Sequence, residues 1–283
     1  MTDWRTRLEP SRPFWGEYRS RIQKFNGNRF PDVKELNRLL ALNLASHGGQ
    51  GIQFVPACDL PGIEYEYHIY TTGQVSTREN NWHDLFNALV WSCFPQFKAA
   101  MNAVHFNARK SGNGKSRGKL RDALTLLDES GAIVVSCNSD SLDALASHDW
   151  SRVFPAGDFH SAVPPIGWQN DGTHVFVCGH ALLEKFLNPY KAITAHALLV
   201  LVDDEMMVMP REALLLELDR ILAGQLVNGQ LLDSPGSLSP LPVMGIPGWW
   251  PHGVQDSEFY ADKQVFRPPR KGRPKASIVV LSV

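Results

Sequence analysis

The segment from Thr77 to Trp91 combines polar side chains with an apolar helical pattern. His83 and Asn87 are four residues apart, so on a helix they share one face, and Asp84 lies beside His83. Histidine is a common metal ligand and a general base near neutral pH, and a carboxylate supplies a hard oxygen ligand. We therefore expect His83 and Asp84 to bind a metal ion, and Asn87 to orient a ligand or contact the substrate.

A structural explanation also fits this segment. Asn80 or Asn81 would cap the helix, and Asp84 would favour its first turn through the helix macrodipole. This explanation accounts for Asp84 but leaves His83 unexplained, so both interpretations stay open.

A second pattern, from Leu126 to Gly131, places Asp128 and Glu129 at the end of a helix. The macrodipole disfavours negative charge there, and a broken local rule often marks a functional site. We expect either carboxylate to be a further metal ligand or the general base. The alternative is an ordinary acidic turn that leads into a strand.

A third pattern, from Gly179 to Glu184, follows a strand. His180 lies where the strand becomes a helix, and Glu184 is four residues later, so the two could bind one ion. The H-E-x-x-H motif itself is absent, and a hydrogen-bonded histidine beside an exposed glutamate is the alternative. His196 lies in an apolar strand and is a further candidate ligand, although a histidine in that setting is more often part of the core.

Two basic segments, 109–121 and 267–275, could bind phosphate or nucleic acid. Charge runs of this kind are usually solvated, so nucleic-acid binding is not favoured. The loop with Trp249 and Trp250 could line a pocket or cover the surface. No P-loop, G-x-S-x-G or strand-linked G-x-G-x-x-G motif occurs.

The elements that would position these residues mix helices and strands irregularly. Helices are expected over residues 31–43, from about 81 to 94, and over 97–106, 120–127, 139–154, 180–187 and 211–222. Strands are expected over 52–56, 64–70, 132–137, 174–178, 192–202 and 276–281. The pattern predicts an α+β (irregular mixed α/β) fold with one domain. We expect an N-terminal arm over 1–28, a core over 29–233, and a Pro/Gly-rich segment over 234–283 that wraps the core largely without regular structure up to about residue 273.

The composition is that of a globular protein. The chain has 283 residues, 43% hydrophobic and 20% charged, and its net charge of −1 gives no strong attraction to nucleic acid or anionic membranes. The four cysteines are scattered, which indicates thiols in a reducing compartment rather than a disulfide framework. No secretory signal is visible, and the longest apolar run, Ala195–Val202, is too short to span a membrane. These features predict a cytoplasmic protein with no membrane partner.

Several segments, in this order, resemble a bacterial family known as DUF3025, a domain of unknown function. They are Arg78–Trp91, the Phe94-Pro-x-x-Lys98 that follows, Leu126–Gly131, Gly179–Glu184 and Phe259–Asp262. The resemblance extends from about residue 30 to 275. It implies a bacterial intracellular protein and brings no activity, substrate or catalytic residue.

The candidate residues together favour a metal-dependent hydrolase, phosphoesterase-like or nuclease-like, with a divalent ion such as zinc, manganese or magnesium. Its substrate would be a small molecule or a phosphate-containing compound. The alternative is a non-catalytic module that binds a small ligand or a protein. Spatial convergence separates the two, because side chains more than about 10 Å apart cannot share one ion.

Overall fold

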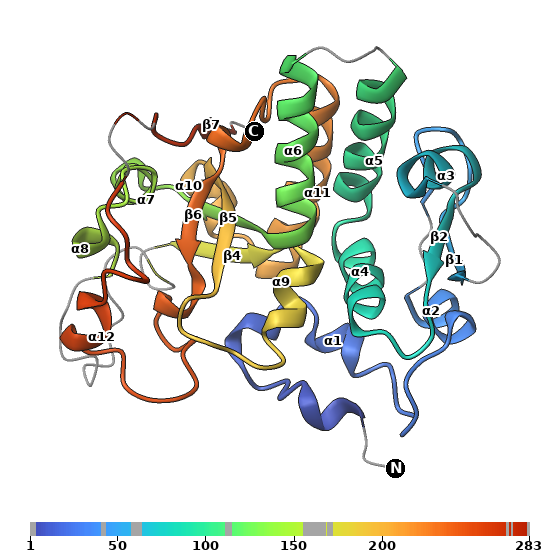
Figure 1. Cartoon of the computed structure of the whole chain (residues 1–283), viewed down its shortest axis with the longest axis horizontal. Coiled ribbons are helices and arrows are strands. Elements are labelled where there is room, and N and C mark those ends of the chain that lie inside the picture. Colours follow the sequence, from blue (N-terminus) through green and yellow to red (C-terminus); the bar gives the residue numbers. More distant parts are fainter. Residues whose placement is uncertain are drawn as a thin grey trace.

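A mixed β-sheet forms the centre of the larger part of the molecule (Figure 1). The computed structural model describes residues 4–40, 44–57, 64–110, 115–154, 168, 172–269, 272 and 274–281, without the side chains of 109–110 and 115–117. The strands of the sheet are β3 (Gly131–Ser136), β4 (Thr173–Val177), β5 (Thr194–Leu201), β6 (Ser239–Pro242) and β7 (Ile278–Val280). Antiparallel β4 and parallel β5 flank β3. The opposite edge of β5 pairs with antiparallel β6 in its first half and with parallel β7 in its second.

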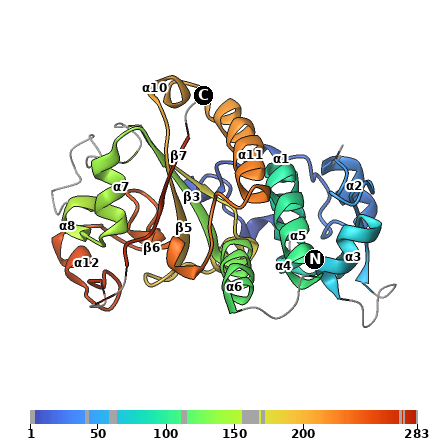
Figure 2. The ribbon, with the colours of Figure 1, turned by 90° about the horizontal axis from the view of Figure 1, so that it is seen from above.

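Helices cover both faces of this sheet (Figure 2). Helix α6 (Lys115–Ser130) packs against β3 and β5 on one face, and α7 (Ser139–Ala146) packs against the other. The central strand β3 is therefore fully buried along its length. This α/β arrangement and the helical part beside it confirm the α+β fold expected from the sequence.

The second part of the molecule is mainly helical and lies beside α6 (Figure 1). It contains α2 (Val33–Leu40), α3 (Tyr65–Thr72), α4 (Trp82–Cys93), α5 (Pro95–Lys110) and α11 (Arg211–Val227), with two parallel strands, β1 (Gln53–Pro56) and β2 (Gln74–Thr77). The remaining elements are η1 (Trp4–Arg7), η2 (Pro13–Trp15), α1 (Arg19–Ile22), α8 (Trp150–Val153), α9 (His180–Lys185), α10 (Asp204–Met207), η4 (Pro235–Ser237), η5 (Val243–Gly245) and α12 (Ser257–Ala261). Pro95 separates α4 from α5, as expected from its missing amide hydrogen.

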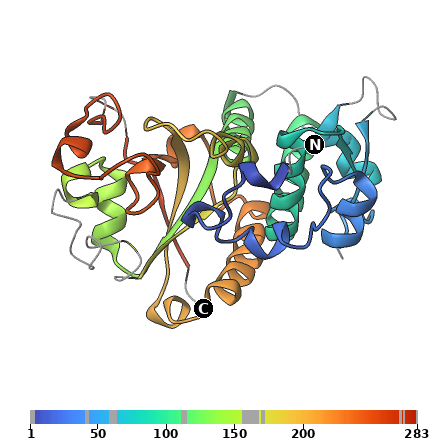
Figure 3. The same ribbon diagram turned by 90° about the horizontal axis from the view of Figure 1, so that it is seen from below.

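The N-terminal segment joins the two parts from below (Figure 3). The Tyr18 hydroxyl donates a hydrogen bond to the carbonyl of Val177 in β4, at 2.5 Å. Arg21 donates to the carbonyl of Ser92 in α4. The aromatic residues of this segment are buried in the main hydrophobic core. The N-terminal segment therefore fixes the position of α4 relative to the end of β4.

The prediction of a strand over 64–70 is wrong, because Tyr65–Thr72 form helix α3. Tyr67 and Tyr70 would lie on opposite faces of a strand, whereas on the helix both pack against Phe106, with ring centroids 5.7 and 3.8 Å away. Gly73 ends the helix in the left-handed conformation, with φ 72°. Packing on α5 therefore overrides the alternating pattern of the sequence.

The expectation of no regular structure over 234–273 is also wrong, because this range contains β6 and α12. Strand β6 includes Pro240 and Pro242, which cannot donate hydrogen bonds to a sheet. They are tolerated because β6 lies at an edge. The strand expected over 276–281 is present as β7.

Helix α6 and the helix expected over 139–154 differ in their bounds from the prediction. Helix α6 begins at Lys115, so part of the expected basic loop 109–121 is helical, while residues 111–114 lie outside the described residues. The helix expected over 139–154 is interrupted between α7 and α8, where His148 has φ 54°. Of the four cysteines, Cys58 lies outside the described residues, and the other three are free thiols. Among the helices described, none is long and apolar enough to cross a membrane.

Asp219 of α11 caps the first turn of α5. Its carboxylate, 1% exposed, accepts hydrogen bonds from the amides of Gln96 and Phe97 at 3.1 and 2.8 Å. Burial raises the pKa of Asp219 to about 6, although these two amides act in the opposite direction. The carboxyl group of Asp219 therefore binds a proton more tightly in the folded protein than in the unfolded chain.

The contribution of Asp219 to stability should consequently fall as the pH rises from about 4 to 6, and stay constant above that. Relative to Asp219→Asn, which does not titrate, the wild type should lose up to about 3 kcal/mol of unfolding free energy between pH 4 and 7. Urea titrations of both proteins across this range measure the difference. A difference that does not change with pH would contradict the prediction.

Candidate metal centre

His83 is positioned by the first turn of α4. Asn81 caps this helix, and its side chain accepts a hydrogen bond from the amide of Asp84 at 3.0 Å. The Asp84 carboxylate in turn accepts two hydrogen bonds from the Arg78 side chain, each 2.9 Å, and one from the Arg78 amide. Asp84 is therefore engaged in holding the chain ahead of the helix, and His83 projects from a fixed turn.

His180 and Glu129 are brought together by a close backbone contact. The amides of Cys178 and Gly179 both donate to the carbonyl of Gly131, at 3.0 and 2.9 Å. A Cβ atom at Gly179 would lie only 2.2 Å from the amide nitrogen of Gly131. The start of α9 is thus pressed against the end of α6, which places His180 beside Asp128 and Glu129.

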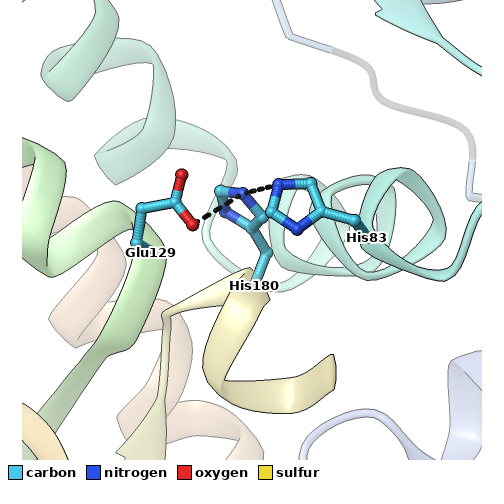
Figure 4. A group of neighbouring side chains, drawn as sticks. All are labelled: His83, Glu129 and His180. Atoms are coloured by element: carbon cyan, nitrogen blue, oxygen red, sulfur yellow. Dashed lines mark hydrogen bonds and ion pairs between the residues drawn. The ribbon is translucent and has the colours of Figure 1, made fainter. Parts of the chain in front are cut away.

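The three side chains His83, Glu129 and His180 converge at this junction (Figure 4). Nε2 of His180 lies 2.9 Å from Nε2 of His83 and 3.7 Å from Oε2 of Glu129. One ligand atom from each residue lies within 4.8 Å of the others. The three side chains therefore lie well within the limit of about 10 Å for sharing one ion, and this group could hold a metal.

Two of the three separations are close to those of ligands on a single ion. Two atoms bound tetrahedrally to one zinc ion at about 2.0–2.1 Å are about 3.3 Å apart. The measured separations of 2.9 and 3.7 Å lie on either side of that value. The ligand atoms of the third pair, His83 and Glu129, lie within 4.8 Å of each other, so binding of one ion would draw these side chains together.

Each histidine also has a carboxylate near its other ring nitrogen. Oε2 of Glu184 lies 3.1 Å from Nδ1 of His83, and Oδ2 of Asp128 lies 3.7 Å from Nδ1 of His180. Carboxylates in this place fix the proton on Nδ1 and leave Nε2 free to bind a metal. Glu184, expected to share an ion with His180, instead contacts His83 on another helix.

Burial and charge set the protonation of this group. Burial lowers the pKa of His180 to about 4, so its ring is neutral at pH 7. Burial alone would raise the pKa of Asp128, but the positive charge and hydrogen bond of Lys98 outweigh it and lower that pKa. Burial raises the pKa of Glu129, against the attraction of His83. A neutral imidazole and an ionised Asp128 suit a cation site.

The group lies in the wall of a cavity of about 450 Å³, large enough for a small substrate. Helices α3, α4, α5, α6 and α9 all contribute to its lining. The lining residues include Tyr65, Glu66, Ser76, Arg78, Asp84, Asn87, His105, Arg121, Thr125 and Asp128, besides the three convergent side chains. Most of these residues carry a polar or charged side chain.

The remaining residues expected from the sequence have different places. Asn87 lines the cavity and donates a hydrogen bond to the Tyr65 hydroxyl at 2.7 Å. Asp84 also lines it, but is paired with Arg78. His196 lies in β5 opposite Gly131 of β3 and is not among the lining residues. Trp249 is buried against Phe14 and Phe186, away from this cavity.

Four residues near the centre were not singled out from the sequence. Tyr65 and Glu66 were missed because α3 was expected to be a strand, and His105 because it lies late in a largely apolar helix. Burial lowers the pKa of His105. Lys98 had a detectable signal, since it is a charged residue between apolar neighbours in the first turn of a helix.

Comparisons with known proteins leave the activity open. A family model described as "Protein of unknown function (DUF3025)" matches residues 52–270, more than three quarters of the chain, and confirms the resemblance noted from the sequence. No curated protein matches the chain, and no solved structure does.

Proposed function

We propose that this chain, which belongs to the DUF3025 family, is a metal-dependent hydrolase. The observation that carries the proposal is the convergence of His83, Glu129 and His180 on the wall of a cavity that many polar side chains line. Three protein ligands leave a coordination position open, which is the arrangement of catalytic rather than structural metal sites.

Each residue of the site would have its own role in binding and orienting the ion. His83 and His180 bind the ion through Nε2, and Glu129 supplies a carboxylate oxygen. Glu184 and Asp128 orient the two imidazole rings from behind. A divalent ion held there supplies a nucleophile near neutral pH by lowering the pKa of a water molecule.

A phosphoester is the substrate class that the cavity suits best. The exposed side chain of Arg121 lines the cavity on α6, and Arg78 lines it near α4. Asp84 neutralises Arg78, so Arg121 is the cation on this wall without a carboxylate partner in the described part of the chain. A guanidinium group binds phosphate oxygens in pairs. Thr125, one helical turn from Arg121, also lines the cavity, but its hydroxyl donates a hydrogen bond to the Arg121 carbonyl at 3.0 Å.

The first test is the metal content of the purified, untagged protein by elemental mass spectrometry. We expect about one equivalent of zinc, manganese or iron. An empty protein that also binds none of these ions when they are added at millimolar concentration would overturn the proposal.

The second test is hydrolysis by the metal-loaded protein of p-nitrophenyl phosphate, bis-p-nitrophenyl phosphate and p-nitrophenyl acetate. We expect cleavage of a phosphoester that disappears with a chelator and returns when the metal is added back. The Glu129→Gln variant, which keeps the shape of the side chain but loses its charge, should bind metal more weakly and lose activity in step. Activity that survives the chelator would contradict a metal mechanism.

Small-ligand binding without catalysis is the second candidate function. Oδ1 of Asn87 is buried and has no hydrogen-bond partner among the described residues, although Asn87 lines the cavity. A ligand that donates a hydrogen bond would satisfy it. Metal binding without turnover of any ester would favour this alternative.

A further inference from the structure

Lys98 is an unusual residue for its position. It lies in the first turn of α5, where the helix macrodipole disfavours positive charge, and its side chain is only 5% exposed. Lysine is rarely buried unless its charge has a partner. Its neighbours in sequence, Phe97 and Ala99, are buried in the apolar core. A buried cation at this place costs free energy that a residue such as methionine would not.

The Lys98 ammonium group has two partners. Nζ donates a hydrogen bond to Oδ1 of Asp128 at the end of α6. It also lies 5.4 Å from the ring centroid of Trp91 in α4, within range of a cation–π interaction. Lys98 therefore connects α5 to the carboxylate that faces the metal centre.

The two oxygens of Asp128 have different neighbours. Oδ1 receives Lys98, and Oδ2 lies 3.7 Å from Nδ1 of His180. Nδ1 of His180 is buried and has no hydrogen-bond partner among the described residues. Asp128 Oδ2 is thus a side-chain acceptor that a small rotation of the imidazole ring would reach. The opposite ring nitrogen, Nε2, faces His83 and Glu129.

We propose that Lys98 is a positioning residue for the metal centre, acting through Asp128 on His180. By holding one oxygen of Asp128, Lys98 aims the other at Nδ1 of His180, so that the proton stays on Nδ1 and Nε2 is presented to the ion. The inference rests on the proposed function, because it concerns the same three ligands. It adds a residue that contacts neither the ion nor the substrate.

The test is titration of the full-length protein with Co²⁺ alone, followed by its visible absorption spectrum. Partners behind a ligand typically change metal affinity 10–100-fold, so Lys98→Met should weaken Co²⁺ binding about 10–100-fold. The cobalt bands should shift, because a rotated His180 changes the geometry around the ion. Lys98→Arg, which keeps a charged donor, should recover part of the loss.

Lys191 provides a matched control. Its Nζ also pairs with a carboxylate, Asp262, at 2.9 Å, and lies 4.4 Å from the ring centroid of Phe259. Neither Lys191 nor its partners line the cavity. Lys191→Met should therefore leave Co²⁺ affinity and spectrum unchanged. If Lys98→Met fails to fold, Asp128→Asn, which has nearly the same size, carries the comparison in its place.

The outcomes separate the two proposals. If the unaltered protein binds no Co²⁺, the proposed function falls. If it binds Co²⁺, but the Lys98 and Asp128 variants bind within twofold of it with the same spectrum, the positioning role is refuted and the metal site stands. If Lys98 acts through Asp128, a double variant, Lys98→Met with Asp128→Asn, should lose no more Co²⁺ affinity than either single variant.

Discussion

The His180→Ala variant is expected to lose metal binding while keeping its fold. His180 is the residue whose Nε2 faces both other candidate ligands, at 2.9 Å from His83 and 3.7 Å from Glu129. Without it only two ligands remain, and a pair of side chains does not form a closed or catalytic metal site. Because even partners behind a ligand are worth 10–100-fold, we expect an affinity loss of at least about 1000-fold.

The fold should tolerate this change. The His180 ring is neutral at pH 7, because burial lowers its pKa to about 4, so no buried charge loses its partner when the ring is removed. Loss of its hydrogen bond with His83 should cost about 1 kcal/mol, with a further cost for the cavity that is left. Elemental analysis gives metal content, and urea denaturation gives stability. Full metal occupancy in the variant would refute the site.

His174 offers the matched control for this experiment. It is partly buried, its pKa is lowered by burial, and Nδ1 lies 3.2 Å from the Arg211 side chain. It does not line the cavity. We expect His174→Ala to retain the wild-type metal content, which would show that loss of a half-buried imidazole elsewhere does not empty the site.

The Gly179→Ala variant should be strongly destabilised. Gly179 has φ −89° and ψ 118°, a conformation open to any residue, so the constraint is space alone. An added Cβ would lie 2.2 Å from the amide nitrogen of Gly131 and 2.7 Å from the carbonyl oxygen of Glu129. Both are backbone atoms, which cannot rotate away as a flexible side chain can.

Overpacking of a core typically costs 1–3 kcal/mol of unfolding free energy, and a clash with backbone atoms should cost more than that. We therefore expect Gly179→Ala to lose about 3 kcal/mol or more of unfolding free energy, measured in urea. Because the same contact presses α9 against α6, the folded fraction should also bind metal more weakly. Unchanged stability would mean that the two segments separate without cost.

Gly224 is the control for this substitution. It lies inside helix α11, and apart from the adjoining residues and the backbone of the helix itself, no atom of the described residues lies within 4 Å of a Cβ built there. Alanine is the better helix former, so Gly224→Ala should stabilise the protein by up to about 1 kcal/mol. The opposite signs of the two variants would separate the effect of space from that of adding a methyl group.

Local sequence patterns were sufficient to predict much of this structure. The cap of α4 at Asn81, the shared face of His83 and Asn87, and the position of Asp128 and Glu129 at the end of α6 all depend on residues a few positions apart. Helix caps and helical periodicity act over that range. The fold class followed from the same kind of information.

The failures share a cause in contacts between distant segments. Helix α3 was expected to be a strand because its residues alternate, yet Tyr67 and Tyr70 pack on Phe106 from one helical face. Strand β6 was hidden by its prolines, which an edge position permits. In both cases the deciding partner lies far along the chain.

The sequence by itself thus determined which residues are fit to bind a metal and which local element carries each of them. Only the tertiary structure decided which of them meet: His83 and His180 are 97 positions apart, and Glu129 joins them, whereas His196 does not. It also assigned Glu184 to His83, and Lys98 to Asp128. The physical reason is that residue type and periodicity act within a few positions. A centre built from three helices instead depends on how the chain packs, here on Gly179 against Gly131.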